Sequence, residues 1–264
     1  MEISGLTRST FYYCLETFEK DKKNEPLCLE ITQIFNENSR RYGYRRVADE
    51  LKKTRTVNYK KVQRLMKKMG LLSPVRRAKY KSYKGEVGKV APDLLQRHFN
   101  ARKPGRRAAT DVSEFAILAG KLYLSPILDM FNGEIIAYSI SVHPDFKQTM
   151  NMLEQGLPKM AKNSILHSDQ GWQYQMSAYR KQLKRYHIRQ SMSRKGNCLD
   201  NSVMENFFGI MKTEMFYGHE FEFGSLDSLK RAMEEYIDYY NNGRIKSKLK
   251  GISPVEFREH SCQN

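Results

Sequence analysis

Residues 165–171 read ILHSDQG and residues 200–208 read DNSVMENFF, and the fold prediction starts from these two stretches. The first is an apolar run that ends in Asp169, as in a buried strand that delivers an acid at its end. The second has a helical pattern and carries Glu205, and 35 residues separate the two acids. The sequence therefore predicts two acids at the ends of regular elements, where metal sites are commonly built.

A third acid, Asp111, lies upstream in the strand-like segment AATDVS at 108–113. Three converging carboxylates suit hard divalent cations, because Mg²⁺ takes oxygen ligands and keeps positions for water and phosphate. A single aspartate in a basic protein is usually only a surface charge, so the prediction concerns the set. Asp111, Asp169 and Glu205 are the expected catalytic residues and ligands of Mg²⁺ or Mn²⁺, with two ions expected.

The apolar segments around these acids predict a ribonuclease-H-like α/β fold with a mixed sheet. Residues 108–142 read as three strands in a meander, with a two-residue hairpin signal at Asn132-Gly133. A helix, a strand, a helix and a strand are expected next, at 147–160, 164–168, 175–185 and 187–192. In this order the first acid lies on the first strand, the second just past the fourth, and the third on a helix beyond a loop.

The positive charge of the chain is concentrated in its front part. The net charge is +17, and residues 1–109 hold 27 Lys+Arg against 11 Asp+Glu, a net +16. A field of this size most often neutralises nucleic-acid phosphates, and a solvated charged surface is the alternative. The charge distribution therefore predicts a nucleic-acid-binding region ahead of a nearly neutral folded part.

Three helices are expected in this basic part, which is predicted to be all-α. Apolar residues follow a helical period at 26–35 and again at 47–51, and a separate short helix or a frayed end precedes them in 1–20. Asn58 is a candidate N-cap for the third helix, which Gly70 can end in a left-handed conformation. This order is typical of a helix-turn-helix, and its outward basic residues are expected to bind DNA: Arg45, Arg46, Lys60, Lys61 and Arg64. A basic helical bundle with another partner is the alternative.

The domain division follows from these patterns. Residues 73–107 are rich in Lys, Arg, Pro and Gly and lack a sustained period, which is typical of a linker that could follow a DNA backbone. We predict a helix-turn-helix-like DNA-binding region at 1–72, a basic linker at 73–107, and a catalytic core with C-terminal helices at 108–264.

Together, these motifs resemble the DDE catalytic core of retroviral-type integrases and, more narrowly, the OrfB transposases of bacterial insertion sequences. The resemblance covers nearly the whole chain and includes HSDQG at 167–171, the 35-residue gap, and Lys212 seven residues after Glu205. It implies a DNA transposase that cleaves the 3′ ends of a mobile element and joins them to other DNA in a metal-dependent reaction. It also implies a homo-oligomer on DNA and a possible partner from an upstream reading frame.

Side chains next to the acids have competing interpretations. Asp200 and Ser202 fit the start of the helix that carries Glu205, as a cap and a capping box, so Asp200 is expected to support the site rather than to join it. Lys212 lies two helical turns past Glu205 on the same face. The resemblance gives Lys212 a contact with DNA, and a surface lysine is the alternative.

Further candidates surround the second acid. His167 alternates with Asp169 along a strand and either points into the site or lies in the core. Trp172 could stack on an unpaired base, although packing is the expected role. Arg194 and Lys195 belong to a basic loop that is expected to bind DNA.

Two positions depart from the pattern that the resemblance implies. Ala108 stands where relatives often carry tryptophan, and Ser113 stands where they often carry threonine. A missing core aromatic could loosen the first strand by roughly a few kcal/mol unless other side chains fill the space. The three acids are intact, so we expect an active enzyme.

Two other functions stay open from the sequence. They are a ribonuclease-H-like metal nuclease and a non-catalytic DNA-binding regulator; the basic front part argues against the first and the complete set of acids against the second. The four cysteines form no CxxC pair, and no apolar run approaches the roughly 20 residues that span a bilayer. We therefore expect a cytoplasmic protein without membrane contact, associated with the nucleoid when it binds DNA.

Overall fold

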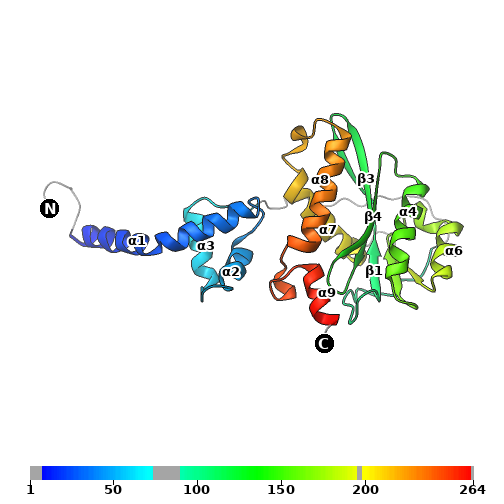
Figure 1. Ribbon diagram of the computed structural model, residues 1–264, viewed down its shortest axis with the longest axis horizontal. Coiled ribbons are helices and arrows are strands. Elements are labelled where there is room, and N and C mark those ends of the chain that lie inside the picture. Colours follow the sequence, from blue (N-terminus) through cyan, green and yellow to red (C-terminus); the bar gives the residue numbers. More distant parts are fainter. Residues whose placement is uncertain (1–7, 74–89, 195–197, 263–264) are drawn as a thin grey trace. The chain divides into compact units, whose positions relative to one another are not determined.

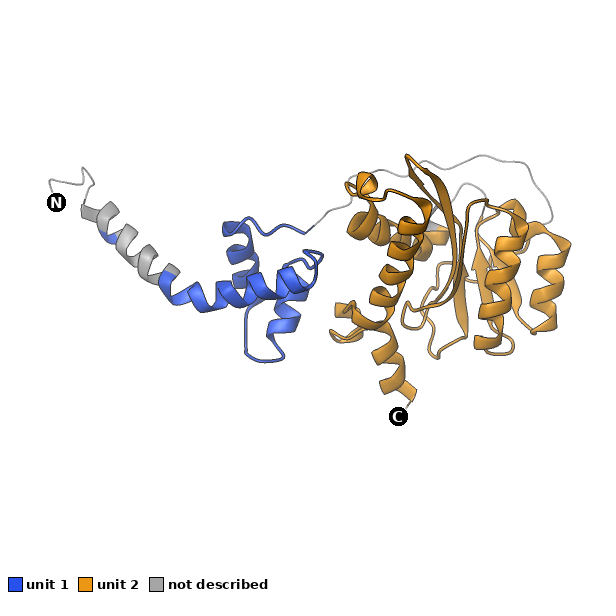
Figure 2. Ribbon diagram, turned by 45° about the horizontal axis from the view of Figure 1, so that its top comes forward, with its two compact units in different colours: residues 1–74 blue, residues 75–264 orange. Residues whose placement is uncertain are grey.

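The computed structural model describes residues 8–73, 90–194 and 198–262. The chain divides into two compact units, Met1–Pro74 and Val75–Asn264, which Figure 2 colours separately. Each unit buries apolar side chains of its own. None of the described helices is long and apolar enough to cross a membrane.

The described part of the first unit is helical, with α1 (Arg8–Glu37), α2 (Tyr44–Leu51) and α3 (Tyr59–Lys68). The predicted apolar stripes are its buried residues, which include Leu27, Ile31, Phe35, Val47, Ala48, Leu51, Val62, Leu65 and Met66. The prediction of a helix that begins at Pro26 is wrong, because α1 runs straight through this residue. Proline lacks an N–H and crowds the preceding turn, so it usually marks a helix boundary.

Both ends of α3 match the prediction. The side chain of Asn58 accepts a hydrogen bond from the N–H of Lys60 at 2.8 Å, as an N-cap does. Gly70 has a φ of 69°, and the N–H of Leu71 donates to the carbonyl of Met66 at 2.9 Å. A left-handed glycine therefore ends this helix.

The second unit is built on one mixed sheet. Its strands are β1 (Arg107–Thr110), β2 (Ser113–Ile117), β3 (Gly120–Asp129), β4 (Ile135–Ser141), β5 (Ile165–Ser168) and β6 (Arg189–Met192). β1 and β2 pair with β3 in a single register, since Thr110 lies opposite Ile127 and Ser113 lies opposite Leu124. They are two segments of one strand, interrupted where Asp111 lies.

The predicted meander at 108–142 is confirmed, with its first strand split into β1 and β2. In the shared register, Pro126 of β3 lies opposite the break, and proline removes one donor from the ladder there. The predicted hairpin joins β3 to β4, but the connection is longer than the predicted two residues, because β3 ends at Asp129 and β4 begins at Ile135. Gly133 in this connection has a φ of 75°. Glycine adopts this left-handed conformation without a steric penalty.

The other half of the sheet is parallel. β5 lies between β1 and β6 and runs parallel to both. The predicted helices are present in the crossovers: α4 (Phe146–Gly156) precedes β5, and α5 (Trp172–Gln175) and α6 (Ser177–Arg185) lie between β5 and β6. This alternation is the expected ribonuclease-H-like order.

Helices cover both faces of the sheet (Figure 1). On one face lie α4 and α6, and on the other lie α7 (Ser202–Met211) and α8 (Leu226–Asp238). Neighbouring strand residues point to opposite faces. Thus Ala108 packs in the cluster under α4 and α6, whereas Ala109 packs in the cluster under α7 and α8.

Shorter elements complete the second unit: η1 (Leu157–Lys159), η2 (Cys198–Asn201), η3 (Lys212–Phe216), η4 (Glu220–Glu222), η5 (Tyr239–Gly243), η6 (Ser247–Leu249) and α9 (Pro254–Cys262). Of these, η3 and η5 are π-helical turns. A buried ion pair joins η3 to the residue that follows η5, with an Arg244 nitrogen 2.7 Å from Glu214 and side chains that are 2% and 8% exposed. The hydroxyl of Tyr236 also donates to Glu214 at 2.8 Å.

The second unit includes part of the range 73–107 that was predicted as a linker. Leu95 is buried in its core. The N–H of Leu94 donates to Ser191 Oγ at 2.9 Å, and the N–H of Met192 donates to the carbonyl of Pro92 at 3.3 Å. Residues 91–95 therefore lie against β6, and the linker interpretation is wrong for them.

Candidate active site

The first two acids lie at the same edge of the sheet. β1 and β5 are neighbouring parallel strands, and they pair Ala109 with His167. Asp111 lies two residues after Ala109, and Asp169 lies two residues after His167, so each acid directly follows the end of its strand. The carboxyl ends of parallel neighbours meet at one edge, so the two side chains come from adjacent positions.

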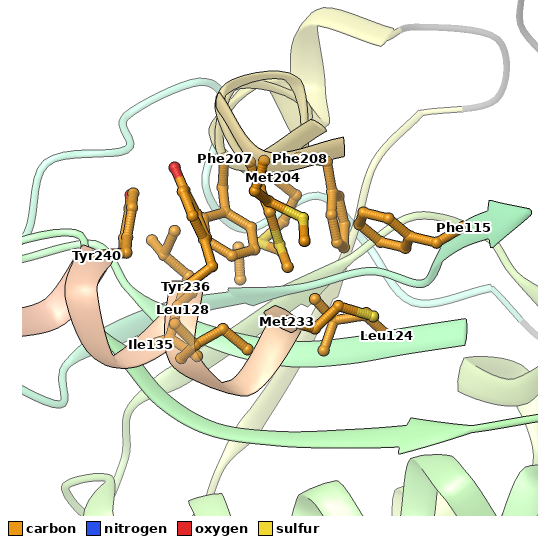
Figure 3. Close-up of a cluster of buried hydrophobic side chains, with 14 of the residues drawn as sticks. Phe115, Leu124, Leu128, Ile135, Met204, Phe207, Phe208, Met233, Tyr236 and Tyr240 are labelled. Carbon is orange, nitrogen blue, oxygen red and sulfur yellow. The ribbon is translucent and has the colours of Figure 1, made fainter. Parts of the chain in front are cut away.

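The third acid lies in the first turn of α7. This helix is held against the sheet by Met204, Phe207 and Phe208, which point toward Phe115 and Leu128 in Figure 3. In the sequence Glu205 lies between Met204 and Phe207, and its side chain is half-buried. The packing of α7 therefore determines where this carboxylate is presented.

The electrostatics of the three acids are linked. Burial raises the pKa of Asp111 well above its ordinary value of 3.8, and the negative charges of Asp169 and Glu205 raise it further. Burial also raises the pKa of Asp169. Hydrogen bonds oppose this effect, from the N–H of Val112 to Asp111 and from the N–H of Gly171 to Asp169, both at 2.8 Å.

The chemistry of this set fits a divalent cation. Buried carboxylates that repel one another are oxygen donors whose charge a cation would compensate. The three acids do not form a complete metal site in this arrangement. In the described part of the chain, no three His, Cys, Asp or Glu residues are grouped so that they could hold a metal ion. Asn201 adds a buried amide whose Oδ1 has no hydrogen-bond partner among the described residues.

Lys212 lies near Asp111. It follows α7 at the start of η3, and its Nζ is 4.9 Å from the centre of the Phe115 ring. Burial lowers the pKa of Lys212, and the charges of Glu114 and Asp111 oppose this shift. The structure thus brings this cation near Asp111, whereas the helical spacing related it to Glu205.

Asp200 is not a helix cap. It is 1% exposed and accepts hydrogen bonds from Arg194 at 2.8 and 3.0 Å and from Arg97 at 2.9 Å. The Arg194 guanidinium is the main cause of the low pKa of Asp200. Among the described residues no side chain caps α7, and the expected capping box at Ser202 is not formed. The prediction that Asp200 supports the site without joining the acids is compatible with these contacts.

Neither Arg97 nor Asn201 was identified as a site residue from the sequence. Arg97 reaches Asp200 across 103 positions, a contact that no local pattern could indicate. Asn201 donates from Nδ2 to Oδ2 of Asp111 at 3.0 Å. Its position in the DNS motif beside Asp200 was the available signal.

His167 is a core residue. It is 1% exposed, its Nδ1 lies 2.9 Å from Ser191 Oγ, and its Nε2 lies 2.9 Å from the carbonyl oxygen of Asp200. A carbonyl only accepts, so Nε2 carries the proton and the serine hydroxyl donates to Nδ1. Burial lowers the pKa of His167, so the neutral ring is favoured.

The predicted packing role of Trp172 is wrong, since its side chain is 55% exposed at the start of α5. Tyr174, two residues later, is fully buried instead and packs edge-on against Tyr179. A hydrophobic side chain is therefore displayed to solvent three residues past Asp169.

The expected DNA-binding residues differ in their surroundings. Arg45, Lys60, Lys61 and Arg64 are exposed on α2 and α3. Arg46 is only half-exposed, and its guanidinium carbon lies 5.5 Å from the centre of the Tyr42 ring. In the second unit, Arg194 is exposed but bound to Asp200, and Lys195 lies outside the described residues.

The fold and the family matches define the class of protein. The integrase core domain family matches residues 101–198 and, in a second family of the same description, residues 205–262. An HTH-like domain family matches residues 22–79. The chain is thus an integrase-type core of ribonuclease-H-like fold with an HTH-like region ahead of it.

Two relatives give the family. The protein named transposase InsK for insertion sequence element IS150 of Escherichia coli is 48% identical over 264 residues, which cover 99% of this chain and 93% of that protein. A transposase-like protein of Haemophilus influenzae is 51% identical over 213 residues, which cover 80% of this chain and 98% of that protein. The chain belongs to the transposases of insertion sequences, and the predicted transposase function is confirmed over the nuclease and regulator alternatives.

Solved integrase cores are more distant. The catalytic core domain of the HTLV-2 integrase, solved in complex with magnesium, is 16% identical with a TM-score of 0.49. The similarity covers 60% of this chain and 98% of that chain.

Proposed function

We propose that Asp111, Asp169 and Glu205 are the catalytic carboxylates of this DNA transposase. The observation that carries the proposal is the emergence of the first two acids from adjacent parallel strands, together with the effect of the Asp169 and Glu205 charges on the pKa of Asp111. Acids with perturbed pKa values at the ends of neighbouring strands, such as Asp111 and Asp169, are candidates for catalytic residues.

The three carboxylates would hold Mg²⁺ or Mn²⁺, and we infer two ions. Asp111 and Asp169 would supply oxygen ligands from neighbouring strands, and Glu205 would supply a third carboxylate from α7. Bound divalent cations supply charge for the attacking and leaving oxygens of a phosphodiester. The protein contributes the ionised oxygens and the buried surroundings that hold them.

The reaction proceeds in two displacements at phosphorus. In the first, water attacks the phosphodiester at each element end, the P–O3′ bond breaks, and the leaving oxygen takes up a proton as a 3′-OH. In the second, this 3′-OH loses its proton and attacks a target phosphodiester, whose own 3′ oxygen leaves. No protein side chain forms a bond with DNA in either step.

DNA contacts are assigned to the basic residues that remain exposed. Arg45, Lys60, Lys61 and Arg64 form the basic outer face of α2 and α3, which we infer binds DNA in the manner of a helix-turn-helix. Arg46, Arg194 and Lys195 would add phosphate contacts. Lys212 would contact the substrate phosphate beside Asp111, because a partly buried ammonium is attracted strongly by an anion there.

The reaction joins DNA ends, and we infer that the transposase acts as a homo-oligomer on DNA. An upstream-frame protein is a further proposed partner, and the bacterial nucleoid is the proposed place of action in the cytoplasm. The division into a DNA-binding region at 1–72 and a catalytic core that includes 108–264 also belongs to this proposal.

A strand-transfer assay tests the catalytic assignment. Labelled element ends and target DNA are incubated with Mg²⁺, and joined products are measured for the unaltered protein and for Asp169→Asn and Glu205→Gln. Both substitutions should abolish joining while DNA binding persists. Full joining by either variant would remove that residue from the catalytic set.

A further inference from the structure

We propose that Asn201 is a positioning residue for Asp111, and that Asp200 holds Asn201 in the place where it can do this. The proposal rests on the assignment of Asp111 as a cation ligand. It adds contacts around Asp111 that set the orientation of its carboxylate.

The contact between Asn201 and Asp111 is direct. Nδ2 of Asn201 donates to Oδ2 of Asp111 at 3.0 Å, and the N–H of Val112 donates to Oδ1 at 2.8 Å. Among the described residues each carboxylate oxygen thus has one donor, which leaves its other lone pair for a cation. Partners of this kind set the orientation of a metal ligand.

Asp111 depends on such support because of its place in the sheet. It lies in the break between β1 and β2, outside the regular ladder that fixes a residue inside a strand. Only side-chain and local contacts are left to orient the carboxylate. Asn201 comes from a segment 90 positions away, so its hydrogen bond ties the break to the start of α7.

Asn201 is itself firmly held through its neighbour. The carboxylate of Asp200 is bound by Arg97 and Arg194, and its carbonyl accepts from Nε2 of His167 at 2.9 Å. That carbonyl belongs to the peptide bond that leads into Asn201. Both the side chain and the main chain of Asp200 are therefore held in place, one residue before Asn201.

The oxygen atom of the Asn201 amide supports the same conclusion. Asn201 is 6% exposed, and its Oδ1 has no hydrogen-bond partner among the described residues. Buried polar atoms are nearly always paired, so an exception calls for an explanation. An oxygen beside Asp111 is well suited to accept a hydrogen bond from a water ligand of a cation bound there.

Trp172 allows a test without DNA. It is the single tryptophan of the chain, it is 55% exposed, and it lies three residues after Asp169. Its fluorescence is therefore expected to be quenched by Mn²⁺ at the acids. The Mn²⁺ concentration for half-maximal quenching is measured for the full chain, with thermal unfolding of the same samples.

Asn201→Ala should raise this concentration about 10- to 100-fold, the usual effect of removing a partner of a metal ligand. Asn242→Ala makes the same change at an exposed asparagine of η5 and should leave the concentration unchanged. Asn201→Ser serves as the milder change if the alanine variant does not fold. A variant that loses thermal stability but titrates like the unaltered protein would overturn the proposal.

Asp169→Asn separates this inference from the proposed function. It should remove the saturable response, and a variant that still titrates normally would argue against the cation site itself. If Asp169→Asn loses the response while Asn201→Ala keeps the original affinity, only the role of Asn201 is rejected. Arg97→Gln, which releases one side of Asp200, should weaken Mn²⁺ binding less than Asn201→Ala does.

Discussion

His167 donates a hydrogen bond from Nε2 to the main-chain oxygen of Asp200, 2.9 Å away and 33 positions later in the chain. The histidine lies on β5 two residues before Asp169, and the aspartate lies in η2 just before α7. A buried neutral imidazole therefore joins the strand of the second acid to the start of the helix of the third.

This relationship predicts a dependence of stability on pH. The folded-state pKa of His167 is lowered from 6.5, so below this value the unfolded chain binds more protons and the free energy of unfolding falls. His167→Gln should remove that part of the slope between pH 7 and 5 and lower stability by about 1–3 kcal/mol at pH 7. Urea unfolding at several pH values measures both effects. His143→Gln, at an exposed position, is the matched control, and an equal change in slope there would contradict the prediction.

Asp111→Asn should stabilise the metal-free protein while it abolishes joining. Because the folded-state pKa of Asp111 is raised, its charge costs stability at pH 7, and a neutral amide removes that cost, by on the order of 1 kcal/mol. The amide of Asn201 can turn so that its Oδ1, which has no hydrogen-bond partner in the part of the chain that the structure describes, accepts from the new side chain. The gain should vanish below about pH 3.8, where the carboxyl is protonated in both states. Thermal unfolding in chelator across this pH range is the measurement, and a loss of stability at pH 7 would count against the electrostatic account.

The buried ion pair between Arg244 and Glu214 should be costly to break. Arg244→Met leaves a buried carboxylate without its partner and should lower the free energy of unfolding by about 3–5 kcal/mol. Replacing both residues together with apolar ones should recover much of this loss. Lys230→Met, which breaks an exposed pair with Glu234 at 3.9 Å, should cost less than about 1 kcal/mol. Similar losses for the two single variants would show that burial does not matter here.

A basic residue of α3 should contribute to DNA binding through charge. Arg64→Ala should weaken binding to element-end DNA and reduce the slope of log K against log salt by about 1, since one phosphate contact is lost. Gln63→Ala, at the neighbouring exposed position of the same helix, should leave the slope unchanged. Fluorescence anisotropy at four salt concentrations provides the slopes, and equal slopes for Arg64→Ala and the unaltered protein would remove this residue from the phosphate contacts.

Local signals in the sequence predicted much of the second unit. Apolar runs located the strands, and a single Asn-Gly pair located the hairpin because only a few residue types accept its backbone conformation. The three acids stood at element ends that a short-range pattern can detect. The break at Asp111 was missed because it is visible only in the pairing with β3, where Pro126 lies opposite it.

The other features of the fold and of the site depend on contacts between segments that are far apart in the sequence, so local patterns did not predict them. Asp200 has the sequence context of a helix cap, yet the two arginines around its carboxylate bind it more strongly than free N–H groups would. Pro26 suggested a helix boundary, but α1 continues through this residue, and Leu27 and Ile31 of the same helix are buried. Ala108 stands where an aromatic was expected and is fully buried in the cluster under α4 and α6.

The segment at 91–95 has a practical consequence. β6 is a terminal strand of the sheet, and this segment lies along it through the bonds of Pro92 and Leu94. Unprotected strand edges template pairing between molecules. A shortened catalytic fragment that began at residue 108 would lose this cover along with Arg97, and we expect it to self-associate, whereas a fragment that begins before Ala91 should stay dispersed.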